Sequence, residues 1–156
     1  MKALTATGVR KTVNIVLPLA ALGVMAFYNT CASTCSSLTG SVFGLDMKYI
    51  GLIIPVPLII LALLNQHLLL LMALSFGVGA ELKLISFQAA LGQYCPYCLT
   101  SGAIIIFLFL FNFQRSRKLL MAAFLLLGFL FFQLFFHGSA SPTYTMAPGI
   151  FSGVHL

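Results

Sequence analysis

The chain has 156 residues, of which 61% are hydrophobic and only 6% are charged. Soluble domains carry about 25% charged residues, so this composition excludes a soluble globular protein and indicates a membrane protein. The formal net charge is +6, but the basic residues stand at the ends of apolar segments and not along one face with aromatic residues between them. We therefore expect the chain to contact the lipid bilayer and to bind no nucleic acid.

Five apolar segments are long enough to cross a bilayer, which takes about 17–25 residues. The first could be a secretory signal, but its apolar stretch exceeds the roughly 7–15 residues of a signal core, and no A-x-A-like site follows. The predicted fold is an all-α membrane protein with one transmembrane domain over residues 1–136. The expected spans are residues 12–28, 47–64, 68–93, 96–113 and 119–136.

Prolines and small residues mark the middle of the predicted bundle. Pro55 and Pro57 are expected to kink the second span, which neighbouring helices in a bundle tolerate. In the third span small residues recur four positions apart, and this spacing lets another helix backbone approach closely. These residues are Ala73, Ser75, Gly77 and Gly79. Residues 137–156 are rich in Gly, Pro and Ser, which predicts a loop or a disordered tail there.

The basic residues predict the orientation of the spans. Lys2, Arg10 and Lys11 precede the first span, and the segment 114–118 follows the fourth. An even number of crossings separates the two clusters, so both lie on the cytoplasmic side. The loop 29–46, the residues around Cys95 and the tail then face outward. We expect a multi-pass protein of the bacterial inner membrane, with its C-terminus on the periplasmic side.

The four cysteines form two close pairs, Cys31 and Cys35 in C-A-S-T-C and Cys95 and Cys98 in C-P-Y-C. Both pairs fall on the predicted outer face, the oxidising side of a bacterial membrane, where disulfides persist. Pro96 suits the first position of a helix, and the unpaired amides of a helix start favour a thiolate. A thiolate is the species that attacks disulfides. The pattern therefore predicts a relay between two dithiol pairs.

Two structural interpretations of the cysteines stay open. The spacings also suit a zinc site, although an oxidising face is a poor place to keep four thiols reduced. Two static disulfides would instead make the protein a non-catalytic membrane scaffold. A relay needs an electron acceptor, and the sequence has no motif for a flavin, a haem or a nicotinamide. We therefore expect a membrane quinone, either ubiquinone or menaquinone.

Two stretches resemble the bacterial homologues of vitamin K epoxide reductase: residues 35–52, CSSLTGSVFGLDMKYIGL, and residues 88–101, QAALGQYCPYCLTS. The resemblance covers residues 12–113. The order of the cysteines fits this family better than the DsbB family, in which the C-x-x-C motif lies in the first outer loop. The resemblance implies a four-helix transmembrane bundle around a quinone, with a fifth, peripheral transmembrane helix.

The resemblance also implies a role for each cysteine. Cys31 exchanges disulfides with a thioredoxin-like partner, Cys35 passes electrons to Cys95, and Cys98 lies beside the quinone. The expected activity makes disulfides in the partner and reduces the quinone; the alternative is a vitamin K quinone or epoxide reductase. Two features depart from the family: the loop cysteines are closer together than usual, and no thioredoxin-like domain is fused. The expected partner is therefore a separate protein.

Other residues are candidates for the quinone site. Ser41 is the nearest match to a Ser or Thr that lines the family's quinone pocket. Phe43 and Tyr97 flank the predicted site and are expected to pack on the quinone headgroup, although interfacial anchoring explains a tyrosine equally well. Glu81 and Lys83 interrupt the third span. Ionisable residues within a membrane are functional candidates by default, so a structural role and a role in proton delivery both stay open for them.

Overall fold

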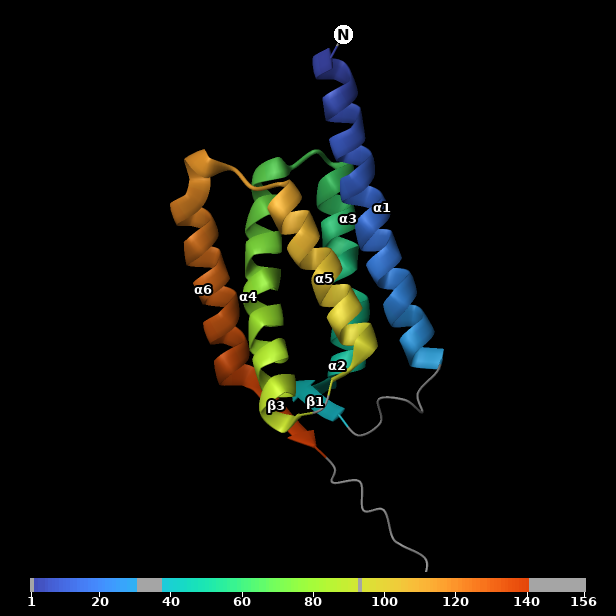
Figure 1. Ribbon diagram of the computed structural model, residues 1–156, viewed down its shortest axis with the longest axis vertical. Coiled ribbons are helices and arrows are strands. Elements are labelled where there is room, and N and C mark those ends of the chain that lie inside the picture. The colour runs from blue at the N-terminus through green and yellow to red at the C-terminus, as the bar shows by residue number, and fades with distance from the viewer. Residues whose placement is uncertain (1, 31–37, 93, 141–156) are drawn as a thin grey trace, which may run out of the picture.

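The computed structural model describes residues 2–30, 38–92 and 94–140, and the chain is mostly helical in this part (Figure 1). A short 3-10 helix, η1, spans Arg115–Arg117. The α-helices are α1 (Lys2–Thr30), α2 (Met47–Ile53), α3 (Pro55–Leu63), α4 (His67–Leu91), α5 (Pro96–Phe111) and α6 (Lys118–Phe135). The strands are β1 (Leu38–Val42), β2 (Leu45–Asp46) and β3 (Phe136–Ala140).

Three helices are long and apolar enough to cross a membrane. They are α1 over Gly8–Thr30, α4 over its whole length, and α6 together with η1 over Arg115–Phe135. The helical segment Tyr49–Leu63 and helix α5 are apolar but shorter. The mostly helical fold is therefore confirmed, with three helices that could cross a membrane by length and composition, whereas the count of four bundle spans plus a fifth stays a prediction.

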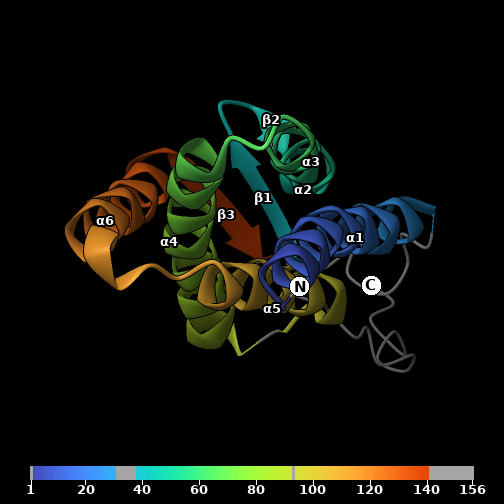
Figure 2. The same ribbon diagram turned by 90° about the horizontal axis from the view of Figure 1, so that it is seen from above.

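The helices α1, α3, α4 and α5 surround one apolar core, and α6 lies against the outer side of α4 (Figures 1 and 2). The sheet closes one end of this arrangement, which we call the sheet end. The core consists of aliphatic side chains from α3, α4 and α5. These residues are Leu58, Ala62, Leu70, Leu74, Val78, Ile105 and Leu108.

Glycines bring α4 and α6 into backbone contact. A Cβ atom on Gly79 would lie 2.7 Å from the backbone N of Phe129, and one on Gly128 would lie 2.9 Å from the carbonyl carbon of Phe76. Real Cβ atoms do not approach other atoms this closely, so only glycine fits at either position. The close approach predicted from the small residues of the third span is confirmed, and its partner is α6.

The second predicted span is divided at Ile54. Helix α2 ends at Ile53, and α3 begins at Pro55. Proline lacks a backbone N–H and clashes with the preceding helical turn, so a new helix starts where a proline can occupy its first position. A kink was predicted at Pro55 and Pro57, and the structure divides the helix directly before Pro55.

Besides the helices, the structure contains a small three-stranded sheet that was not predicted from the sequence. β1 lies in the centre, and both β2 and β3 pair with it in antiparallel register. β3 begins at Phe136, the last residue of the fifth predicted span, and continues into the tail that was predicted as a loop. The loop prediction is therefore wrong for residues 137–140, and residues 141–156 lie outside the described part. The glycine and serine of β3 suggested a loop, but Gly138 is needed here, because a Cβ would collide with the ring of Phe87.

A polar cluster links α1 to α5 at the end opposite the sheet. The side-chain amides of Asn14 and Asn112 form two hydrogen bonds of 3.1 and 2.7 Å, and both residues are buried. Arg10 Nε donates a third, of 3.1 Å, to Asn112 Oδ1. Arg10 and the basic residues of η1, which closely follow Asn112, therefore lie at the same end of the molecule.

Candidate functional site

The C-P-Y-C motif forms the start of α5 at the sheet end. Cys95 is the N-cap, with extended backbone angles, and Pro96 is the first helical residue, as the sequence predicts. Helix α4 ends just before, at Leu91, and its C-cap residue Gly92 has a left-handed φ of 65°, which suits glycine. Gln88 on the last turns of α4 accepts a hydrogen bond of 3.0 Å from the backbone N–H of Cys95. The motif is thus held against α4 by a side chain.

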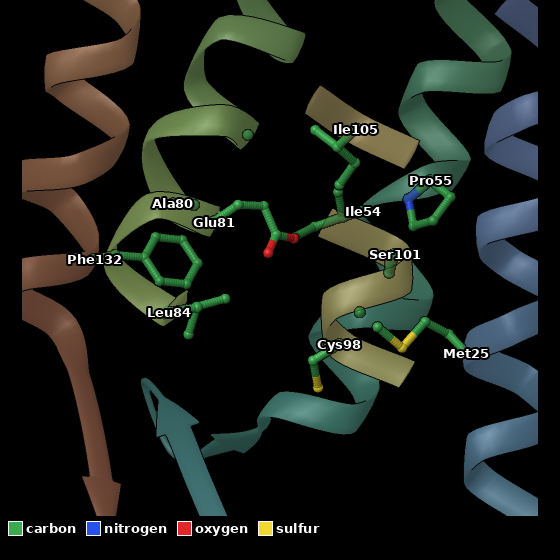
Figure 3. A pocket seen from close by; sticks show the side chains of 12 residues that line it. Met25, Ile54, Pro55, Ala80, Glu81, Leu84, Cys98, Ser101, Ile105 and Phe132 are labelled. Carbon is green, nitrogen blue, oxygen red and sulfur yellow. The ribbon is translucent and has the colours of Figure 1, made fainter. Parts of the chain in front are cut away.

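The two cysteines of the motif differ in their surroundings. Cys95 is only 3% exposed, whereas Cys98 is half-buried and lines a cavity inside the bundle (Figure 3). The cavity has a volume of about 40 Å³ and is lined by residues from α1, α2, α3, α4, α5 and α6, and by Ile54. Its walls are mostly apolar side chains, including Met25, Leu84 and Phe132. Cys98 is therefore one of the residues at the border of a mostly apolar cavity.

Two further polar side chains line this cavity. Glu81 extends from α4 into the cavity (Figure 3), and Ser101 lies on α5 and is 2% exposed. Among the residues that the structure describes, neither side chain has a hydrogen-bond or ion-pair partner. Buried polar groups are almost always hydrogen-bonded. The cavity therefore holds two polar groups that a bound molecule can satisfy.

Gly102 lets the Glu81 carboxylate reach α5. A Cβ atom on Gly102 would lie 2.7 Å from Glu81 Oε2 and 3.1 Å from its carboxyl carbon. Gly102 follows Cys98 by four residues, one helical turn or about 6 Å along the axis. The Glu81 carboxylate therefore lies against α5 about one helical turn from Cys98, on the same face of that helix.

The structure separates the other predicted site residues from the cavity lining. Tyr97 packs on α1, with its ring centroid 5.4 Å from that of Tyr28. Phe43 is 69% exposed in the β1–β2 turn, and its ring lies 4.7 Å from Phe135 of α6. Ser41 pairs with Asp46 and His137 in the sheet. Cys31 and Cys35 lie outside the described residues.

The sequence analysis missed Gln88, Ser101 and Gly102. Their signal is helical spacing: Ser101 and Gly102 follow Cys98 by three and four residues, and Gln88 follows Glu81 by seven, so each pair shares a helix face. A serine or glutamine in an apolar helix is otherwise explained by a local hydrogen bond. In the folded chain the packing of α4 against α5 places Ser101 at the cavity and Gln88 beside the backbone N–H of Cys95.

A metal centre is not formed by the described residues alone. In residues 2–30, 38–92 and 94–140, no group of three or more His, Cys, Asp and Glu side chains is placed to hold an ion. The zinc interpretation needs Cys31 and Cys35, which lie outside these ranges, so it stays untested.

The chain was also compared with known proteins. No family model, no curated protein and no solved structure matches it. The resemblance to the homologues of vitamin K epoxide reductase therefore stays a hypothesis, and the function is argued from the chain's own residues.

Proposed function

We propose that this protein is a membrane thiol oxidoreductase that makes disulfides in a thioredoxin-like partner and passes the electrons to a membrane quinone. The electrons would travel through Cys31 and Cys35 and then through Cys95 and Cys98. The observation that carries the proposal is the position of Cys98, on the first turn of α5 and lining a cavity inside the bundle. A redox-active C-x-x-C pair needs one cysteine that an acceptor can reach, and Cys98 has that access.

The cavity suits a quinone headgroup in its chemistry. Apolar side chains would pack on the ring, while Glu81 and Ser101 offer hydrogen-bonding groups for its oxygens. Its volume of about 40 Å³ is well below the roughly 300–1,000 Å³ of pockets that enclose a whole ligand. Binding therefore requires side chains at the edge of the cavity to move, with the isoprenoid tail remaining in the lipid.

The reaction balances in two-electron steps. Oxidation of a dithiol forms one S–S bond and releases two electrons and two protons. Reduction of a quinone to a quinol consumes two electrons and two protons. The overall reaction converts one partner dithiol and one quinone into one partner disulfide and one quinol, and its direction follows the relative reduction potentials.

The proposed location is the bacterial inner membrane, with the sheet end on the periplasmic side. Arg10 and the basic residues of η1 lie at the end opposite the sheet, whereas Cys95 and Cys98 lie at the sheet end. Under the positive-inside rule the basic end faces the cytoplasm. The cysteines then face the compartment in which disulfide formation is useful to secreted proteins.

Disulfide transfer to a partner tests this proposal. The purified protein in detergent is mixed, without oxygen, with a reduced thioredoxin-like protein and a ubiquinone or menaquinone analogue. We expect partner disulfide and quinol to appear in equal amounts, and Cys98→Ala to stop both. The exposed Ser86→Ala on α4 is the control and should retain full activity. Partner oxidation without quinol, or full activity of Cys98→Ala, would contradict the proposal.

A further inference from the structure

Glu81 is the most unusual residue of the cavity. It lies within α4, one of the three helices that are apolar and long enough to cross a membrane, and its carboxylate extends between α4 and α5 (Figure 3). Burying an ionisable group without a partner is costly, and in membrane helices such groups mark proton or substrate pathways. A purely structural role would be served better by an apolar side chain at this position.

Its surroundings leave the carboxylate available for a ligand. The cavity walls that face it carry apolar side chains from α1, α3 and α6, namely Met25, Pro55 and Phe132. Among the described residues of the lining, Cys98 on α5 is the other group that titrates. Lys83 is two residues along α4, a spacing at which helical side chains do not face each other.

We infer that Glu81 is the proton-transfer residue between the Cys98 thiol and the acceptor bound in the cavity. The inference rests on the proposed function, because it assigns the route of the protons that accompany the electrons. The carboxylate lies one turn deeper than Cys98 along α5, beside Gly102, so an acceptor that contacts Cys98 in the cavity also meets Glu81.

The two thiols of Cys95 and Cys98 supply both protons that the quinone takes up. The Glu81 carboxylate accepts the proton that leaves the Cys98 thiol, and the resulting carboxylic acid donates it to a quinone oxygen. The second thiol proton, released as the Cys95–Cys98 S–S bond forms, follows the same route after Glu81 has returned to its carboxylate form. Two protons and two electrons leave the dithiol, and the same number end on the quinol.

Glu81→Gln tests this inference, because the amide keeps the shape of the side chain but does not carry a proton. Anaerobic quinol formation by the pre-reduced protein is measured over a range of quinone concentrations. Two further readouts do not depend on quinone turnover: the affinity for the quinone analogue, and the temperature of unfolding in detergent. Glu81→Asp keeps the carboxyl group, and Lys83→Gln removes a charge two residues away on the same helix.

We expect kcat of Glu81→Gln to fall by at least about 100-fold, the lower range for loss of a general acid–base group. Quinone affinity and the unfolding temperature should stay at the wild-type level, Glu81→Asp should recover part of the rate, and Lys83→Gln should be unaffected. A Glu81→Gln rate within about threefold of wild type would overturn the inference. Loss of quinone affinity together with a lower unfolding temperature would also overturn it, by showing a structural role. Failure of the proposed function is distinct, since the wild-type protein would then form no quinol.

Discussion

The side-chain oxygen Oε1 of Gln88 accepts a hydrogen bond of 3.0 Å from the backbone N–H of Cys95. Gln88 is buried on α4, and Cys95 is the buried N-cap of α5. The bond therefore ties the first residue of the C-P-Y-C motif to the helix that also carries Glu81. This contact fixes where the motif sits relative to the cavity.

Loss of this hydrogen bond should disturb both stability and cysteine chemistry. Gln88→Ala removes the side-chain oxygen that accepts this hydrogen bond from the buried N–H of Cys95, and loss of such an acceptor costs about 1–3 kcal/mol. We expect a lower temperature of unfolding in detergent and slower disulfide formation between Cys95 and Cys98 with a quinone. Gln133→Ala, at an exposed position of α6, is the control and should change neither. Wild-type rates and stability of Gln88→Ala would show that the contact does not hold the motif.

The space beside Gly102 should be needed for the Glu81 carboxylate. Gly102→Ala places a Cβ atom 2.7 Å from Oε2, so the carboxylate must move while its charge is kept. We expect kcat for quinol formation to fall by about tenfold or more, since small misplacements of reacting groups are costly. Ala103→Leu, at the next and exposed position of α5, should retain the wild-type rate. An unchanged rate in Gly102→Ala would mean that the carboxylate acts from another position.

The crossing of α4 and α6 should tolerate no side chain at its two glycines. Gly79→Ala forces the helix backbones apart, because the new Cβ would lie 2.7 Å from the N of Phe129. Overpacking of this kind lowers the free energy of unfolding by about 1–3 kcal/mol. We expect a lower temperature of unfolding in detergent. Gly23→Ala on α1 has no atom within 4 Å of its Cβ and should be neutral or slightly stabilising. Equal stability of the two variants would contradict the close crossing.

The polar cluster at the opposite end should stabilise the pairing of α1 with α5. Asn14→Leu removes both hydrogen bonds between Asn14 and the buried amide of Asn112, which keeps those with Arg10 and with the carbonyl of Leu108. The loss of two hydrogen bonds costs about 1–3 kcal/mol. The control is Asn29→Leu, because among the described residues the Asn29 side chain bonds to the carbonyl of Met25 within α1, at 3.1 Å, and to no other helix. We expect a lower unfolding temperature for Asn14→Leu alone. The same loss in both variants would show that the cluster makes no special contribution.

The helices could be predicted because apolar segments of bilayer length and prolines determine helix position from the local sequence alone. The predicted limits of the spans fall close to the ends of α4, α5 and α6, and the start of α3 at Pro55 follows from the chemistry of proline alone. The small residues around Gly79 predicted a close helix contact correctly. Their partner, Gly128, was not identified, since the pairing of two helices depends on tertiary packing.

The sheet and the cavity could not be predicted either, because both depend on tertiary packing. Gly138 and the residues beside it have the composition of a loop, and only pairing with β1 makes them a strand. Glu81 was recognised as unusual, but its position opposite Gly102 depends on how α4 lies on α5. Phe43 and Tyr97 were placed near the quinone because of their positions in the sequence, whereas their rings pack on α6 and α1.

A thiol count tests the central claim most directly. The protein is fully reduced in detergent, freed of oxygen, and mixed with a ubiquinone or menaquinone analogue, and its thiols are titrated with a maleimide over time. The account predicts that all four cysteine thiols are lost while one quinol forms for each pair. Thiols that persist in the presence of quinone, together with zinc that co-purifies, would contradict the account and support a structural role for the cysteines.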